Sequence, residues 1–113
     1  MTTTSTGRQA EATAAEYLQQ QGFAILEQNW RTRYCEIDIV ARKGQTVYFV
    51  EVKYRASDSW GEGLDYITPN KLKQMGFAAE VWVNSNNWSN DYQLAAIEVS
   101  GKDFAVTNFL LEL

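Results

Sequence analysis

The sequence predicts an α/β fold, with a mixed central sheet of about five strands flanked by helices, in the order αβββαββ. Five short apolar segments have the lengths and β-branched content typical of strands, and two longer segments are rich in helix formers. The two strands within residues 35–54 are apolar on both faces, apart from a charged end. A ribbon apolar on both faces is typical of the middle of a sheet that is covered above and below.

The composition predicts one domain of ordinary globular type. The chain has 113 residues, of which 45% are hydrophobic and 21% charged, enough for one modest core. We expect a flexible N-terminus over residues 1–6 and a single domain over residues 7–113. No run approaches the roughly 18 apolar residues of a membrane span, and residues 1–6 lack the features of a signal peptide. We therefore expect a cytoplasmic protein with no membrane partner.

The residue types limit the chemistry. The chain has no histidine and one cysteine, Cys35, which excludes an ordinary structural zinc site and histidine-based catalytic triads. A metal must then be held by oxygen ligands, which favours magnesium, manganese or calcium. Next to an acidic cluster, Cys35 is interpreted as an inert strand residue rather than a nucleophile. The net charge of −4 argues against a generally basic nucleic-acid coat protein.

The first half of the chain predicts one helix and three strands. Gly22 is placed to end the helix, and Gly44 suits a tight hairpin turn between the second and third strands. The predicted elements are a helix over 8–20 and strands over 23–28, 35–41 and 46–54, with residues 29–33 connecting the first two strands.

The second half predicts one helix and a hairpin. Thr68 suits the N-cap and Pro69 the first position of a helix that runs to about Asn84. A loop over residues 55–66 precedes this helix. Two late strands are predicted over 92–99 and 104–111, with a turn over 100–103 between them.

Charged side chains in the central hairpin are the main functional signal. Glu36 and Asp38 share one face of the second strand, and Glu51 and Lys53 share one face of the third. With a two-residue loop at 44–45, Asp38 faces Glu51 and Glu36 faces Lys53. Opposed like charges are destabilising, so we expect a divalent cation to compensate them.

A simpler interpretation is a surface salt bridge between Glu36 and Lys53, worth about 0–1 kcal/mol, with the other acids solvated. Charges that converge on an otherwise apolar ribbon fit that interpretation poorly. Carboxylates from adjacent strands suit magnesium, and Lys53 can orient a water or stabilise developing negative charge. Glu11, beside the apolar stripe of the first helix, is available to pack over the same face. Taken alone, Glu11 is better explained as an acid near a helix N-terminus, where the helix dipole favours negative charge.

Asp38 followed by Glu51-Val52-Lys53, with the helical Glu11 before them, resembles the PD-(D/E)XK nuclease superfamily. Further blocks resemble the YraN family, small bacterial proteins similar to archaeal Holliday junction resolvases. These blocks are Gly7-x-x-Ala10-Glu11, Tyr17-Leu18, Gly22, Asn29-Trp30-Arg31, Glu36-Ile37-Asp38, Phe49-Val50-Glu51-Val52-Lys53-x-Arg55 and Thr68-x-x-Lys71. The resemblance covers about residues 7–99, of which 29–55 is the specific part. It implies a restriction-endonuclease-like fold.

The resemblance also implies residue roles. Asp38 and Glu51 would be ligands of Mg²⁺ or Mn²⁺, Lys53 the catalytic lysine and Glu11 an auxiliary acid. Glu36 belongs to the same motif and has no assigned role.

Three cations are candidates for contacting phosphates, namely Arg31, Arg55 and Lys71. Each taken singly is equally well explained as solvated surface charge. Trp30 and Trp60 are candidates for stacking on bases. The alternative for each is that it packs in the core or anchors a loop.

The chain departs from the YraN pattern at three places. Ala10 and Cys35 stand where the family usually has glycine, and residues 91–94 replace an Arg-Phe-Asp element.

The preferred hypothesis is a Mg²⁺- or Mn²⁺-dependent endonuclease that hydrolyses phosphodiesters in DNA, in preference to RNA, including branched or junction DNA. The alternative is a catalytically inactive nucleic-acid- or protein-binding module on the same scaffold. The sequence leaves open whether the protein is a homodimer. An enzyme that cuts two strands of a junction is often a dimer with two active sites, but no motif in this chain marks an interface.

Overall fold

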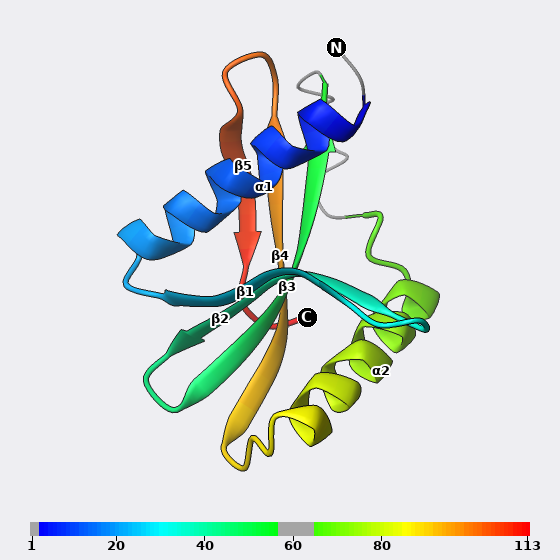
Figure 1. The fold of residues 1–113 in the computed structure, drawn as a ribbon. Coiled ribbons are helices and arrows are strands. Elements are labelled where there is room, and N and C mark those ends of the chain that lie inside the picture. Colours follow the sequence, from blue (N-terminus) through cyan, green and yellow to red (C-terminus); the bar gives the residue numbers. More distant parts are fainter. Residues whose placement is uncertain (1–2, 57–64) are drawn as a thin grey trace.

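The computed structural model describes residues 3–56 and 65–113 and has the predicted α/β architecture in the predicted order, αβββαββ. Trp60, a candidate for base stacking or for anchoring a loop, lies outside the described residues. The elements are α1 (Thr3–Gln20), β1 (Ala24–Arg31), β2 (Glu36–Lys43), β3 (Thr46–Arg55), α2 (Pro69–Ser85), β4 (Asp91–Ser100) and β5 (Ala105–Leu110) (Figure 1).

The sheet is mixed, as predicted, and its five strands follow one another in chain order. The pairs β1–β2, β2–β3 and β4–β5 are antiparallel, whereas β3 and β4 are parallel. A parallel pair needs a long crossover connection, and α2 lies in that connection. The crossover therefore brings α2 onto one face of the sheet, against β2 and β4 (Figure 1).

The central hairpin has the predicted register. Lys43 pairs with Thr46, which leaves Gly44 and Gln45 as a two-residue loop. Gly44 has a φ of 63°, a left-handed conformation that glycine adopts without strain. The same register continues to the pair Ile39–Val50, so each strand presents alternate residues to opposite faces.

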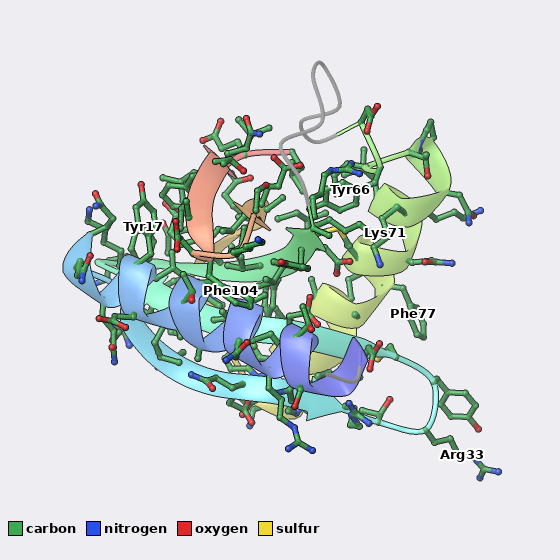
Figure 2. The ribbon with its side chains drawn as sticks, turned by 90° about the horizontal axis from the view of Figure 1, so that it is seen from above. Tyr17, Arg33, Tyr66, Lys71, Phe77 and Phe104 are labelled. Atoms are coloured by element: carbon green, nitrogen blue, oxygen red, sulfur yellow. The ribbon has the colours of Figure 1, made fainter. Side chains whose placement is uncertain are left out.

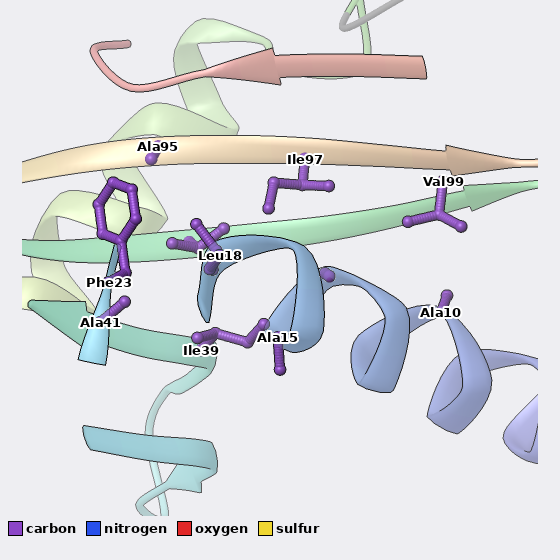
Figure 3. Close-up of a cluster of buried hydrophobic side chains, with 11 residues drawn as sticks. Ala10, Ala15, Leu18, Phe23, Ile39, Ala41, Ala95, Ile97 and Val99 are labelled. Atoms are coloured by element: carbon purple, nitrogen blue, oxygen red, sulfur yellow. The ribbon is translucent and has the colours of Figure 1, made fainter. Parts of the chain in front are cut away.

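Each face of the sheet has its own core. The first packs α1 against the sheet (Figure 3), through Ala10, Ala14, Ala15, Leu18, Phe23, Ile39, Ala41, Val50, Ala95, Ile97 and Val99. The second packs α2 against the other face, through Ile37, Val40, Val47, Phe49, Ala78, Ala79 and Trp82. The two-sided burial of β2 and β3 confirms that they form a central ribbon.

Two element boundaries differ from those predicted by more than two residues. Helix α1 begins at Thr3 rather than at Arg8, and β1 continues to Arg31, through residues that were expected to connect two strands. Trp30 pairs with Ile37 in this extension of β1. Asn29 has a φ of 53°, a conformation that asparagine tolerates better than most residues. Pairing with β2 thus outweighs the local turn signal.

Within residues 3–56 and 65–113, neither helix has both the length and the apolar character that crossing a membrane requires.

We predict that Ile97→Ala lowers the free energy of unfolding by about 2–5 kcal/mol, because it leaves a cavity between α1 and the sheet. Ile97 is fully buried in the first core, whereas Leu26 on the edge strand β1 is 42% exposed. The matched variant Leu26→Ala should change stability by no more than about 0.5 kcal/mol. Urea unfolding measures both, and equal losses would contradict the placement of this core.

Candidate active site

Asp38 lies where strands β2 and β3 separate. The recorded ladder of backbone pairs reaches Ile39–Val50, and beyond it the carboxylate Oδ2 of Asp38 accepts a hydrogen bond of 2.8 Å from the backbone N–H of Val52. The side chain therefore satisfies a backbone donor that the ladder would otherwise use. On the other side of β2, the left-handed Asn29 interrupts the regular geometry of β1. The position of Asp38 is fixed by the main chain rather than by a flexible surface contact.

Asp38 and Glu51 line the same groove, as their shared face predicts. The groove has a volume of about 550 Å³. It is lined by Tyr34, Cys35, Glu36, Asp38, Glu51, Asn70, Lys71, Lys73, Gln74, Met75 and Phe77. Carboxylates from two strands thus meet lysines, amides and aromatic rings in one concave site, the usual form of a ligand-binding site.

The charge of Asp38 is unfavourable in this position. Burial, and after it the nearby carboxylate of Glu51, raises the pKa of Asp38 to about 7. Glu11 and Glu36 act in the same direction, while the hydrogen bond from Val52 opposes them. Because its pKa lies near neutral pH, Asp38 gains from binding either a proton or a cation, and such acids are often found at functional sites.

Lys71 compensates the charge of Glu51. The ammonium of Lys71 lies 2.9 Å from the Glu51 carboxylate, and both side chains are partly buried. The cap of α2 fixes this contact, because Thr68 accepts a hydrogen bond from the backbone N–H of Lys71 and Pro69 begins the helix, as predicted. The first turn of α2 therefore places the ammonium group of Lys71 beside the carboxylate of Glu51.

Lys53 lies beside an aromatic ring. Its ammonium is 5.6 Å from the ring centroid of Tyr66, within the range of a cation–π contact. The hydroxyl of Tyr66 is buried and has no hydrogen-bond partner among the described residues. Burial raises the pKa of Tyr66, and the charges of Glu51, Glu98 and Asp38 raise it further. Glu36, which the sequence placed opposite Lys53, forms an exposed ion pair with Arg31 at 3.6 Å.

Arg55 belongs to a polar network around a buried acid. Glu98, which is 4% exposed, accepts hydrogen bonds from Thr107 (2.8 Å), Asn108 (2.7 Å) and Arg55 (2.7 Å). Burial disfavours its charge, but these donors outweigh that effect and lower the pKa of Glu98. Arg55 also pairs with Asp65 at 3.2 Å. Two carboxylates thus hold Arg55, and its contact with phosphate stays a prediction.

Glu11 lies outside the groove that Asp38 and Glu51 line. Because α1 packs with Ile39 and Val50 in the first core, it lies on the opposite face of the sheet from α2, whose residues line that groove. Glu11 instead lines a second groove of about 410 Å³ together with Gly7, Arg8, Asn29 and Arg31. Its charge still reaches Asp38, whose pKa it raises. Glu11 and Arg31 are therefore close to the acids but outside the main groove.

The donor set fits a cation that keeps water ligands. In the part of the chain that the structure describes, no three histidine, cysteine, aspartate or glutamate side chains gather closely enough to enclose a metal. Asp38 and Glu51 share a groove and supply two carboxylates. Magnesium is commonly held by one or two carboxylates plus waters and substrate phosphates, so two acids are sufficient.

Sequence reasoning missed two aromatic residues of the groove. Tyr34 and Phe77 are 77% and 51% exposed, and both line the groove with the acids. Phe77 lies off the buried stripe of α2, which is formed by Met75, Ala78, Ala79 and Trp82. Trp30 packs against the second core, which confirms the alternative to base stacking that the sequence analysis gave for it. Cys35 lies 3.3 Å from the hydroxyl of Thr32.

Comparison with known proteins identifies relatives along most of the chain. The model of a family described as "Uncharacterised protein family UPF0102" matches residues 10–103. A protein named "UPF0102 protein" from Vibrio campbellii is 38% identical over 102 residues, covering 86% of this chain and 84% of the relative. One with the same name from Chlorobium chlorochromatii is 43% identical over 94 residues, covering 83% and 73%.

We predict that, without metal, Asp38→Asn is more stable than the wild type above pH 7. The folded pKa of about 7 exceeds the ordinary value of 3.8, so the native state binds more protons between these values. Wild-type stability should therefore fall as pH rises through this window, and the variant should avoid a cost of about 1 kcal/mol or more.

Denaturant unfolding in EDTA between pH 5 and pH 8 measures this difference. Glu80→Gln removes an exposed charge from α2 that does not act on Asp38 and is the control, expected to follow the wild type. Identical pH profiles for Asp38→Asn and the wild type would show that the charge of Asp38 is not destabilising.

Proposed function

The chain belongs to the uncharacterised protein family UPF0102, and from this premise we propose that it is a metal-dependent nuclease of the PD-(D/E)XK type that hydrolyses phosphodiester bonds in DNA. The family name assigns no activity, so the proposal depends on the site. The observation that carries it is the meeting of Asp38 and Glu51 in one groove, with Lys53 two residues beyond Glu51 on β3.

Asp38 and Glu51 are the residues that would hold Mg²⁺ or Mn²⁺. When bound, such a cation polarises a phosphoryl oxygen and favours the ionisation of water. The raised pKa of Asp38 supports this role, because a cation would relieve the repulsion between two partly buried carboxylates. Asp38 is also held in place by the N–H of Val52, which reduces the reorganisation that binding requires.

The lysines supply the positive charge that hydrolysis of a phosphodiester needs. In this reaction a water oxygen attacks phosphorus, the bond to one bridging oxygen breaks, and the leaving oxygen takes a proton. Lys53 lies on the same strand as Glu51 and is suited to stabilise negative charge that develops on the phosphate. Lys71 and Lys73 line the groove and are candidates for binding the flanking phosphates.

A non-catalytic nucleic-acid-binding module is a second candidate. The ion pair of Lys71 with Glu51 at 2.9 Å favours it, because one of the two acids is already compensated without a metal. This candidate predicts DNA binding that survives Lys53→Ala, with no hydrolysis under any metal condition.

We predict that the wild type cleaves DNA in Mg²⁺ or Mn²⁺, and that Asp38→Ala, Glu51→Ala and Lys53→Ala each lose about 100-fold or more of that activity. A panel of single-stranded, duplex, tailed and branched oligonucleotides, separated on denaturing gels, measures the rates. Glu80→Gln removes an exposed acid from α2 outside the groove and should keep the wild-type rate.

Isothermal titration with Mn²⁺ separates the two candidates. Heat of binding that Asp38→Asn abolishes, together with cleavage, supports the nuclease. DNA binding without cleavage and without Mn²⁺ binding supports the non-catalytic module and rejects the nuclease.

A further inference from the structure

The groove carries the two most exposed aromatic side chains recorded for the described residues. Tyr34 is 77% exposed and Phe77 is 51% exposed. They come from different elements, since Tyr34 lies in the turn between β1 and β2 and Phe77 lies on α2. Both line the same groove as Asp38 and Glu51. Single exposed aromatics need no explanation, but two that share one groove with paired acids do.

Tyr34 is displayed by an ordered turn. Thr32 accepts hydrogen bonds through its hydroxyl from the N–H groups of Tyr34 (3.1 Å) and Cys35 (3.2 Å), and its own N–H donates to the carbonyl of Cys35 at 2.8 Å. The guanidinium of Arg33 lies 5.6 Å from the ring centroid of Tyr34. The turn therefore presents an aromatic ring and a cation together on a backbone that these hydrogen bonds hold.

Phe77 completes a mixed face of α2. Asn70, Lys73, Gln74 and Phe77 follow the spacing i, i+3, i+4 and i+7, which places them on one side of a helix, and all four line the groove. Figure 2 shows Phe77 projecting from α2 on the same side of the molecule as Arg33. This face combines two amides, one ammonium group and one ring. It lacks the continuous apolar stripe that a helix needs to dock on another protein.

The chemistry of this set matches an unpaired nucleotide. Aromatic rings stack on bases of any sequence, lysine and arginine attract phosphates, and amides can hydrogen-bond to base edges. In a duplex, the flat faces of the bases are covered by their neighbours, so an aromatic wall finds no partner there. A net charge of −4 also provides no extended basic surface for gripping duplex DNA.

We propose that Tyr34 and Phe77 stack on unpaired bases, so that this groove takes single-stranded DNA, either free or as the tail or branch of a duplex. The inference deepens the proposed nuclease function and rests on the same groove. The phosphates of the strand lie against Lys73 and Arg33, and the strand passes the two acids.

Binding in EDTA tests this without cleavage. Fluorescence anisotropy with a single-stranded oligonucleotide, a blunt duplex of the same sequence and a tailed duplex should give at least about tenfold tighter binding for the two substrates with unpaired bases. Tyr34→Ala and Phe77→Ala should each weaken single-strand binding by about 5- to 150-fold, which corresponds to the loss of one stacked base. A 2-aminopurine in the strand should be quenched by the wild type and not by these variants.

Conservative and distant variants keep the test specific. Tyr34→Phe should bind as the wild type does, and Phe77→Leu, which stays apolar but cannot stack, should behave like Phe77→Ala. Leu26→Ala, an exposed apolar residue outside the groove, should have no effect on binding. Thermal melting confirms that each variant is folded.

The outcomes separate this inference from the nuclease proposal. Wild-type affinity in Tyr34→Ala and Phe77→Ala, or a duplex that binds as tightly as the single strand, overturns the stacking inference even if metal-dependent cleavage is found. Quenching that depends on both rings supports the inference even if no cleavage is found.

Discussion

The carboxylate of Asp38 is the constraint on which the site depends. It accepts the N–H of Val52 at the point where β2 and β3 part, so its position is set by the backbone of the central hairpin. Burial and the nearby Glu51 make its charge costly and raise its pKa to about 7. A fold keeps such a carboxylate only if a proton, a cation or a ligand compensates it. The groove beside it offers room for such a partner.

The topology of the sheet brings the rest of the site to this point. The parallel pairing of β3 with β4 requires a crossover, and the crossover contains α2. Its first turn places Lys71 on Glu51, and its next turns line the groove with amides and Phe77. The other face of the sheet is closed by α1, whose side chains fill the first core. Each face therefore has a core that provides stability, and the candidate chemistry lies in the groove beside α2.

The parts of the site that the sequence predicted depend on local rules. Gly44 fixed the hairpin register as far as the pair Ile39–Val50, and Asp38 and Glu51, the next residue on each strand, line one groove. What the sequence could not predict depends on contacts made across long chain separations. The ion pair of Lys71 with Glu51 depends on the path of the crossover, and the buried Glu98 depends on donors from β5. The register likewise could not show which face α1 would cover, or that Glu11 would line a second groove while still acting on Asp38.

Crystals soaked in Mn²⁺ test the central claim most directly, because the anomalous signal locates the ion independently of any assay. The account predicts one strong peak coordinated by the carboxylates of Asp38 and Glu51, with the ammonium of Lys71 moved away from Glu51. It predicts no such peak in crystals of Asp38→Asn. A groove without a peak, in which Lys71 still holds Glu51, would contradict the claim that these acids are gathered to bind a metal.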